Sequence, residues 1–469
     1  MKGYLSRFRL DYVRTLIYML QATEYHAWEF VKWCHRTKDF GQVMRRRVLV
    51  WTNKARLLYA VITGVQVAML GAVAVLVFWP TSGIALILIG LFLLMLLPIL
   101  LEFLLVLVVK LGDFFITRPL AKKRIAAATE KLAGIKAVKI AVVGSYGKTT
   151  TKEVLKTILA SGKRVQATPG NMNQPLSIAE FIMGLSGDEE ILIFEIGEYH
   201  MGDVRKMCEI VRPDFGVITG VSEAHLANFK TLENIKKTFD EIRAFVPDER
   251  LYLNGDNAIL ADEQGVKYAQ DGMAGFKVSG VKLRAFGTEF TMNKEKVQTA
   301  LLGAHNIGVV VLGMYLAEKQ FGAKREAVKR AVAELKPFEH RMEPKKVNGA
   351  VVIDDTYNGN LEGVKAGLKL LKSLEGKRKI YVTPGLVEQG KKTAEIHTEI
   401  GREIGFVASE VVLMNNSTTQ FIQKGLDEVG FAGEVKVVDS PLLFYENLPQ
   451  YVAQGDIVLM QNDWTDNYA

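Results

Sequence analysis

The sequence predicts an α/β protein with an N-terminal transmembrane helical hairpin, a mostly parallel central sheet domain and a smaller doubly wound C-terminal domain. Three observations support this fold class: two long apolar runs, a glycine turn between a strand and a helix, and a strand–helix alternation that continues to the C-terminus. The predicted parts are a basic juxtamembrane segment, the hairpin, a connecting helix, the central domain and the C-terminal domain, at residues 1–56, 57–110, 111–136, 137–337 and 338–469.

The two apolar runs predict the membrane hairpin. Leu57–Trp79 contains no charged residue, and Ile84–Val109 contains one, Glu102. Each run is long enough to cross a bilayer as a helix; the alternative is a pair of buried core helices. Basic residues flank the pair and are absent from its central link, so two spans in the cell membrane with both chain ends in the cytoplasm are expected. Glu102 is expected to reach the membrane interface, with an intramembrane proton site as the alternative.

The excess of positive charge is confined to the N-terminal segment. The first 56 residues hold 12 lysines and arginines against 4 acidic residues, and the rest of the chain is balanced, at a formal net charge of +8 overall. A basic segment beside a membrane suits the anionic inner leaflet, and the balanced remainder argues against nucleic-acid binding. Apolar residues at helical spacing predict amphipathic helices that lie on this leaflet or on the soluble domain. Cys34 and Cys208 are expected to be reduced thiols.

Residues 144–151 read Gly-Ser-Tyr-Gly-Lys-Thr-Thr-Thr and directly follow the apolar run Val138–Val143. A strand, a glycine turn and a helix that opens with Lys-Thr predict a P-loop-type phosphate site. Backbone N–H groups at the helix start face the anion, the lysine adds a charge, and the hydroxyl can ligate magnesium. The spacing departs from the common motif, because Val142 stands where the earlier glycine is expected. The candidate phosphate-binding residues are Gly144, Ser145, Gly147, Lys148, Thr149 and Thr150.

Alternating strand and helix patterns predict the two sheet domains. The first series has strands near 138–144, 164–168, 190–197 and 215–221, and helices near 148–160, 175–185, 203–211 and 231–245. An antiparallel appendage over 266–301 and helices near 305–321 and 324–335 complete this domain. After a hinge at 336–338, the second series has strands near 349–355, 379–384, 410–414, 434–438 and 456–461.

Polar side chains follow several of the predicted strands. Glu195 and His225 come at the carboxyl ends of their strands, where open α/β sheets bind ligands, and beside Thr149 they are candidate ligands for magnesium on a transferred phosphate. In the second domain, Asp354 and Asp355 are candidates to accept ribose hydroxyls or to position the lysine of the first domain. The alternative is that one of them is the N-cap of the following helix, but Asn358 or Asn360 could equally be that N-cap.

Two residues at the start of a predicted helix are the last candidates. His305-Asn306 either meets an adenine edge or caps the helix, and the residues alone do not favour one role.

Taken in order, these motifs resemble the Mur ligase family, which makes peptide bonds to muramyl peptides with ATP, over roughly residues 138–463. The matching segments are 144–152, 168–173, 195–197 with His200, 212–214, 218–226, 253–256, 303–306, 340–343, 353–358 and the late His397. The resemblance implies three domains, of which the last closes onto the central one. It also implies ATP and Mg²⁺ as cofactors, and a muramyl peptide and an amino acid or dipeptide as partners.

The resemblance also implies roles for individual residues. Lys148 and Thr149 would bind the β/γ-phosphates and magnesium, and Glu195 and His225 would ligate the metal. The nucleotide would also meet Asn306 at its adenine, Arg341 and Asp355 at its ribose and phosphates, and Asn358. A substrate carboxylate would attack the γ-phosphate to give an acyl phosphate, which an amine then displaces. Both steps build negative charge on oxygen atoms, which cations stabilise.

Three departures from the family pattern stand out. The lysine that family members carbamylate to bind a second magnesium is replaced by Phe239, with Asp240 or Lys237 as candidate substitutes. The usual Lys-Gly-Ser near the C-terminus is replaced by Gln461-Asn-Asp-Trp464. The family's N-terminal domain, which grips UDP, has no counterpart, and the basic segment and hairpin stand in its place. The third departure leads to the hypothesis of a lipid-linked acceptor.

Three functions therefore compete. The leading one is a membrane-anchored, ATP-dependent amide ligase acting on muramyl peptides at the inner leaflet. The second is a ligase for another acid, of the folate or γ-glutamyl type. The third is a membrane-anchored nucleotide-binding scaffold without catalysis, which Phe239 favours and the joint presence of Lys148, Glu195 and His225 opposes. The sequence predicts neither the amino acid added nor the oligomeric state.

Overall fold

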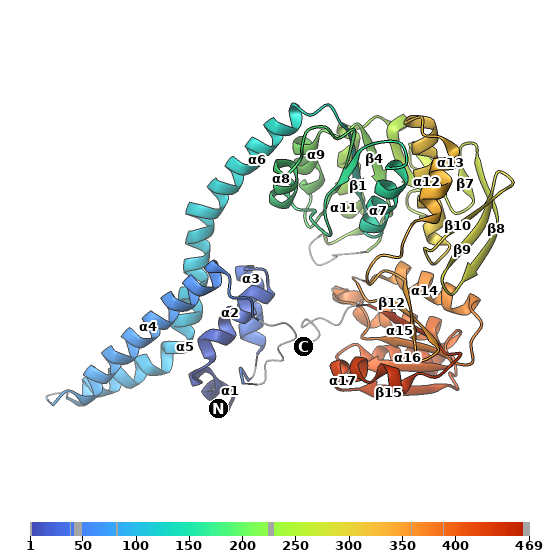
Figure 1. The fold of residues 1–469 in the computed structure, drawn as a ribbon. Coiled ribbons are helices and arrows are strands. Elements are labelled where there is room, and N and C mark those ends of the chain that lie inside the picture. The colour runs from blue at the N-terminus through green and yellow to red at the C-terminus, as the bar shows by residue number, and fades with distance from the viewer. Residues whose placement is uncertain are drawn as a thin grey trace. The chain divides into compact units, whose positions relative to one another are not determined.

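The computed structural model describes residues 2–37, 39–41, 49–80, 83–223, 229–357, 359–387 and 389–462. The chain divides into two compact units, Met1–Lys123 and Arg124–Ala469. In the described residues the first unit is helical, and the second carries both β-sheets (Figure 1).

The first unit is a helical hairpin with a smaller N-terminal bundle packed on it. Its elements are α1 (Lys2–Leu5), η1 (Ser6–Phe8), α2 (Tyr12–Ala22), α3 (Ala27–Arg36), α4 (Asn53–Phe78), α5 (Ile84–Gly112), the π-helical turn η2 (Asp113–Thr117) and the start of α6 (Arg118–Ala133). By length and composition, α4 and the continuous helix from Ile84 are apolar enough to cross a membrane. Both carry many large exposed apolar side chains, which does not fit the alternative of buried core helices.

The N-terminal helices pack differently from what the sequence predicts. α2 buries eight of its eleven residues, and its apolar side chains cluster with Leu58 and Ile62 of α4 and Leu101 and Leu105 of α5. The apolar spacing correctly predicts a helix here. However, its apolar face is covered by the hairpin itself, which was not among the two arrangements expected.

An ion pair links this bundle to the hairpin. The Arg7 guanidinium lies 2.7 Å from the Glu102 carboxylate of α5, and the Tyr12 hydroxyl donates to the same carboxylate oxygen at 2.5 Å. Both charged side chains are less than one-fifth exposed. Arg7 also donates to the Cys34 carbonyl of α3 at 3.4 Å. Glu102 therefore has structural partners inside the protein, where the sequence predicts an interfacial carboxylate.

Replacing Arg7 by alanine is expected to open the N-terminal bundle, because it leaves the Glu102 carboxylate enclosed without its cation. Cys34 reports the opening: its thiol is buried, and this burial raises its pKa, so it reacts slowly while the bundle is closed. We expect maleimide to label Cys34 at least about tenfold faster in Arg7→Ala. Buried Cys208 of the second unit serves as the internal reference.

The matched control is Arg9→Ala, which removes a half-exposed partner of Asp11 and should leave the labelling of Cys34 unchanged. Equal labelling rates in Arg7→Ala and the wild type would show that the ion pair does not hold the bundle.

The central domain is built on a ten-stranded sheet. Its strands are β1 (Val138–Val143), β2 (Val165–Ala167), β3 (Ile191–Glu195), β4 (Phe215–Ile218), β5 (Leu251–Asn254), β6 (Val266–Ala269), β7 (Gly272–Met273), β8 (Phe276–Arg284), β9 (Gly287–Met292) and β10 (Glu295–Thr299), in the spatial order 10-9-8-7-6-5-4-1-3-2. The strands from β2 to β6 pair in parallel, and β6 to β10 pair antiparallel. The predicted appendage therefore continues the same sheet.

Helices cover both faces of this sheet (Figure 1). One face packs on α7 (Lys148–Leu159), α12 (His305–Tyr315) and α13 (Arg325–Ala333), with the π-helical turn η5 (Leu316–Gln320) after α12. The other face packs on α8 (Pro175–Met183), α9 (Asp203–Val211), α11 (Leu232–Asp240) and the end of α6, with the short turn η3 (Glu241–Ala244) after α11. A second short turn, η4 (Asp248–Arg250), directly precedes β5. Strands that run as continuous apolar stretches fit a sheet buried on both faces.

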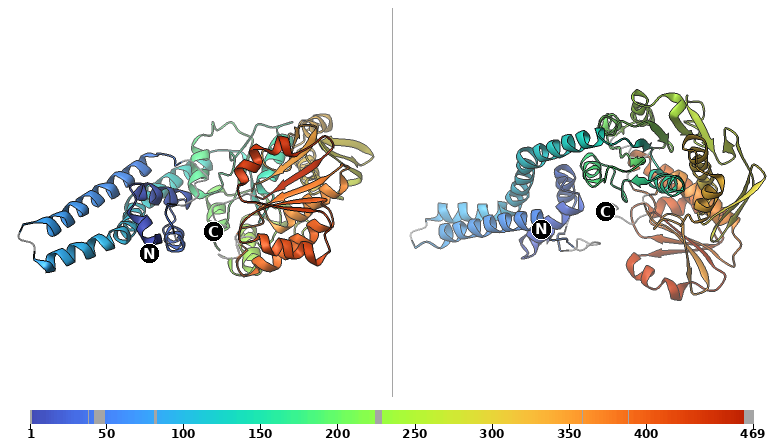
Figure 2. Two further views of the ribbon diagram at one scale, coloured as in Figure 1. Left: turned by 90° about the horizontal axis from the view of Figure 1, so that it is seen from below. Right: turned by 45° about the horizontal axis from the view of Figure 1, so that its top comes forward.

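The C-terminal domain has a six-stranded sheet, with helices on both faces (Figure 2). Its elements are β11 (Glu343–Val347), β12 (Ala350–Asp355), α14 (Leu361–Ser373), β13 (Lys379–Thr383), η6 (Gly390–Lys392), α15 (Thr393–Gly405), β14 (Glu410–Met414), α16 (Thr419–Glu428), β15 (Glu434–Val438), α17 (Pro441–Glu446), α18 (Leu448–Tyr451) and β16 (Ile457–Gln461). The spatial order is 11-12-16-13-14-15, and all neighbours except β11 and β12 are parallel.

Candidate active site

The glycine turn after β1 has the geometry of a phosphate-binding loop. β1 lies between β3 and β4, and α7 begins at Lys148 directly after Gly147, whose φ is +73°. At Gly144 the φ is +138°, and a Cβ atom would lie 2.3 Å from the hydroxyl oxygen of Thr219. Both positions favour glycine, for the backbone conformation and, at Gly144, for the close approach. The N-terminus of α7 is thereby presented at the carboxyl edge of the sheet.

Lys148 is held in place by three acceptor atoms of two residues. Its ammonium donates to the Gly144 carbonyl at 2.6 Å and to both carboxylate oxygens of Glu198 at 3.1 Å. The Lys148 side chain is 15% exposed and that of Glu198 is 3% exposed. The sequence singles out Lys148 but gives no sign that Glu198 is its partner.

Glu195 carries a carboxylate oxygen suited to a cation. Its Oε1 accepts from the Asn173 amide at 3.1 Å, whereas its buried Oε2 makes no hydrogen bond in the described structure and lies 3.4 Å from the Lys152 ammonium. Lys152 is fully buried and donates to the Gly170 carbonyl at 2.6 Å. A buried oxygen of this kind fits the hard oxygen ligands that Mg²⁺ prefers, and Glu195 and Thr149 both line one cavity of the second unit. His225, the other predicted ligand, lies outside the described residues.

The C-terminal domain adds Arg341 to the site. Its guanidinium donates to the Thr149 hydroxyl at 3.1 Å and stacks over the Tyr357 ring, 4.5 Å from the ring centroid. The Tyr357 hydroxyl in turn accepts from the Asn171 amide at 3.1 Å. The predicted nucleotide-binding residue Arg341 therefore reaches the phosphate loop from the second domain.

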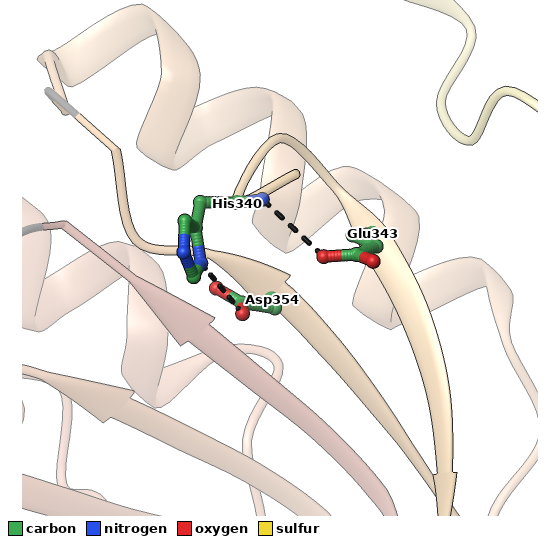
Figure 3. Close-up of side chains that lie close together, drawn as sticks. All are labelled: His340, Glu343 and Asp354. Carbon is green, nitrogen blue, oxygen red and sulfur yellow. Dashed lines mark hydrogen bonds and ion pairs between the residues drawn. The ribbon is translucent and has the colours of Figure 1, made fainter. Parts of the chain in front are cut away.

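A network of ionic side chains fixes the backbone on either side of Arg341. The His340 imidazole lies 2.9 Å from the Asp354 carboxylate, and the backbone N–H of His340 donates to the Glu343 carboxylate at 3.3 Å (Figure 3). These three side chains are close enough together to hold a metal ion. However, the Lys345 ammonium already lies 2.8 Å from Asp354 and 3.0 Å from Glu343, so a lysine supplies the positive charge. Burial alone would raise the pKa of Asp354, but hydrogen bonds from Lys345, Thr356 and His340 outweigh it and lower that pKa.

Asp355, at the end of β12, is one of the carboxylates that line the cavity. It accepts from the Gln461 amide at 2.7 Å and from the Met342 N–H at 3.1 Å. Its side chain keeps partial contact with the cavity, yet the enclosing protein desolvates the carboxylate and raises its pKa to about 7. Gln461, noted in the sequence as a departure from the family pattern, therefore positions a predicted ribose ligand.

The raised pKa of Asp355 predicts a pH-dependent stability. The folded protein binds this proton more tightly than the unfolded chain, so the stabilisation is complete below pH 4 and is lost as the pH rises through about 7. We expect Asp355→Asn to remove this dependence. The melting temperature of the variant minus that of the wild type should therefore increase by roughly 2–5 °C between pH 5.5 and 8.5.

Asp439→Asn, in an exposed loop, is the control and should follow the wild type at every pH. Parallel curves for Asp355→Asn and the wild type would contradict a raised pKa.

Three asparagines remain among the residues that the sequence predicts for the site or for a helix cap. Asn306 is buried on the cavity wall and donates to the Leu302 carbonyl at 2.7 Å, so its contact with adenine stays a prediction. Asn358 lies outside the described residues. Asn360 caps α14 by accepting from the Gly363 N–H at 2.8 Å, which leaves Asp354 and Asp355 to other roles, as expected.

The candidate substitutes for the carbamylated lysine do not face the site. Phe239 is buried in the core on the far side of the sheet from α7. Lys237 is exposed and lies 2.7 Å from Glu233, and Asp240 lies 3.1 Å from Arg243. None of these three lines the cavity. A role for Asp240 or Lys237 in place of the missing ligand stays a prediction, although neither side chain lines the cavity in this structure.

The site residues described above surround one cavity of about 1080 Å³, which lies between the central and C-terminal domains. Its walls include the predicted residues Ser145, Gly147, Lys148, Thr149, Thr150, Glu195, Asn306, Arg341 and Asp355. Gly144, the first residue of the loop, does not line the cavity. The cavity also includes residues to which the sequence assigns no role, notably Asn173, Glu198, Lys365, Lys369 and Lys392. Their positions depend on domain packing, which no local sequence pattern reveals.

Known proteins share this architecture. Residues 142–316 match the Mur ligase middle domain, and residues 340–461 match the Mur ligase glutamate ligase domain. UDP-N-acetylmuramoyl-tripeptide–D-alanyl-D-alanine ligase of Bacillus subtilis is 28% identical over 330 residues, covering 69% of this chain and 72% of that protein. The Escherichia coli enzyme of the same name is 25% identical and covers 56% and 61%. This chain thus spans roughly three-fifths to seven-tenths of the length of such relatives.

Solved structures show the same fold. MurF ligase from Thermotoga maritima in complex with ADP superposes with a TM-score of 0.64 at 24% identity, covering 73% of this chain and 80% of that one. MurF from Acinetobacter baumannii gives 0.63 at 21% identity, covering 74% and 77%.

A glycine loop that opens a helix toward a cavity between two domains with mostly parallel sheets is typical of a phosphate-binding α/β protein. The two family matches, which together cover well over half of the chain, make the assignment specific. The chain belongs to the Mur ligase family. Ligases of this family use ATP and Mg²⁺ to form C–N bonds.

Proposed function

We propose that this protein is a membrane-anchored, ATP-dependent amide ligase that acts on a muramyl peptide. The observation that supports this most strongly is the convergence of Lys148, Glu195 and Arg341 on one cavity, beside the N-terminus of α7. The loop and Lys148 would bind the triphosphate, and Arg341 would contact the phosphates from the second domain. Such cations stabilise the charge that develops as the γ-phosphate is transferred to a carboxylate.

The donor set fits a bound magnesium ion. The Glu195 carboxylate and the Thr149 hydroxyl would hold it, together with His225. When bound, the ion would neutralise charge on the transferred phosphate. The second domain would exclude water, which otherwise hydrolyses an acyl phosphate before an amine displaces it.

The membrane anchor is the second part of the proposal. α4 and α5 are long enough to span a bilayer, and basic residues flank both sides of the pair, so the catalytic domains would lie in the cytoplasm. The family matches begin only at residue 142, so they do not cover the N-terminal unit.

The names of the relatives favour UDP-linked muramyl tripeptide as the acceptor and D-alanyl-D-alanine as the amine. The anchor favours a second candidate, the same peptide linked to a membrane lipid, since both would then be held at one surface. A folate or γ-glutamyl acid is the remaining acceptor class.

The deciding experiment is a ligation assay with the full chain in lipid vesicles. It measures phosphate release and product mass for UDP-linked muramyl tripeptide, its polyprenyl-linked form and a folate, each with D-alanyl-D-alanine or single amino acids. Phosphate release that requires both acid and amine, with the expected adduct, would support the ligase. Nucleotide binding without turnover across the panel would favour a scaffold. A clear preference for the UDP form would end the lipid-linked hypothesis.

A further inference from the structure

Tyr357 contacts both domains at the cavity, and the proposed reaction assigns it no role. It lies in the loop that follows β12, is partly buried and lines the cavity. The Arg341 guanidinium of the same domain lies over its ring, 4.5 Å from the centroid, and its hydroxyl accepts from the Asn171 amide of the central domain at 3.1 Å. One side chain therefore joins the arginine of one domain to a loop of the other.

The ring is a contact that Arg341 can keep when a phosphate enters the loop. Within the described ranges, the guanidinium donates one hydrogen bond, to the Thr149 hydroxyl at 3.1 Å, and a phosphate would take over this donor. Stacking on an aromatic face is compatible with that exchange, because it leaves the N–H groups in the guanidinium plane free to donate. The backbone supports the stack, since the Tyr357 N–H donates to the carbonyl of His340 at 3.3 Å.

Asn171 is a firm point of attachment in the central domain. The residue before it, Gly170, accepts through its carbonyl from the fully buried Lys152 of α7 at 2.6 Å. Two residues after it, the Asn173 carbonyl accepts from the Gly197 N–H at 2.8 Å. The Tyr357 hydroxyl is therefore bonded to a segment that is itself held on both sides.

We propose that Tyr357 is a positioning residue that aims Arg341 at the nucleotide phosphates, and that its bond to Asn171 ties this placement to contact between the two domains. The inference rests on the proposed nucleotide site and deepens it. An arginine side chain loses conformational freedom when it binds a phosphate, and a ring that already orders the side chain reduces this cost. Removing the ring should therefore weaken nucleotide binding, and should do so through Arg341.

The test is a double-mutant cycle of ATP binding, measured by calorimetric titration of the detergent-solubilised full chain with Mg²⁺ present. Tyr357→Ala should raise the ATP dissociation constant about fivefold or more, and Arg341→Ala about tenfold or more. In the Arg341→Ala background, adding Tyr357→Ala should change the dissociation constant less than about twofold, because no guanidinium is left to position. A merely structural role would give the same loss in both backgrounds. If Tyr357→Ala folds poorly, Tyr357→Leu, which fills the space without an aromatic face, takes its place in the cycle.

Tyr357→Phe separates the hydroxyl from the ring. It keeps the stack on Arg341 and removes the bond to Asn171, so the ATP dissociation constant should rise about threefold. Asn171→Ala should have the same effect, and the double variant should lose no more than either single one. The matched control is Tyr315→Phe, which changes a partly buried tyrosine of α12 that does not line the cavity and should leave ATP binding unchanged.

An ATP dissociation constant that Tyr357→Ala leaves unchanged, or raises equally with and without Arg341, would overturn the positioning role and leave the proposed function intact. Unchanged binding in both Tyr357→Phe and Asn171→Ala would overturn the tie to the central domain. No ATP binding to the wild type would overturn the proposed function as well.

Discussion

Replacing Lys148 by alanine is expected to reduce ATP-dependent ligation by about 10²–10³-fold. In the proposed site, this lysine is one of the cations that would face the transferred phosphate. The loss should appear mainly in turnover, because charge on the phosphate oxygens is greatest in the transition state. Phosphate release and adduct formation, measured with the best acceptor from the panel, give the magnitude.

Lys156→Ala is the control for this substitution. Lys156 lies on the same helix, α7, but does not line the cavity. Its variant should retain wild-type turnover. Equal activity of Lys148→Ala and Lys156→Ala would refute the assignment of the phosphate loop.

Lysine substitutions in the hairpin are expected to abolish retention in the membrane. Val67, Leu88 and Phe92 are each at least 60% exposed in the described structure. In water, a lysine at such positions is tolerated. In a bilayer, it costs about 2.5–3.5 kcal/mol near the helix centre. The triple variant Val67→Lys, Leu88→Lys and Phe92→Lys should therefore leave the carbonate-washed membrane fraction, in which the wild type remains.

The control substitutions, Leu442→Lys and Leu443→Lys, change exposed apolar side chains of α17 in the C-terminal domain. They should not alter the distribution between membrane and supernatant. Recovery of the unmodified chain in the supernatant, or full retention of the hairpin variant, would contradict the anchor.

Most of the fold follows from local sequence patterns. The strand ending at Val143, the glycine turn and the helix from Lys148 are all encoded within about 20 residues, and they lie where predicted. Two strands were missed. β5 is only four residues long, and β11 reads Glu-Pro-Lys-Lys-Val, a charged, proline-containing sequence typical of an edge strand.

The residues of the site could be predicted only where they belong to a local sequence motif. Lys148, Glu195 and Asp355 stand at strand ends or at the glycine turn, so their places in the cavity follow from the alternation of strands and helices. Contacts between distant segments could not be predicted. Gln461 reaches Asp355 across 106 residues of sequence, and Arg7 reaches Glu102 across 95. The partner of Lys148 is a single glutamate in a loop, and only its packing identifies it.

The hydrogen bond from Arg341 to Thr149, with the exposed ion pair between Lys392 and Glu223, joins the central and C-terminal domains across the cavity. A nucleotide that reaches the loop must compete with these contacts. The rate constant of nucleotide binding would therefore be limited by separation of the domains and would fall below the diffusion limit. Salt screens exposed charges, so higher ionic strength would loosen the outer pair. The rate of capture would then rise with salt, opposite to the usual behaviour of an anion approaching a cationic pocket.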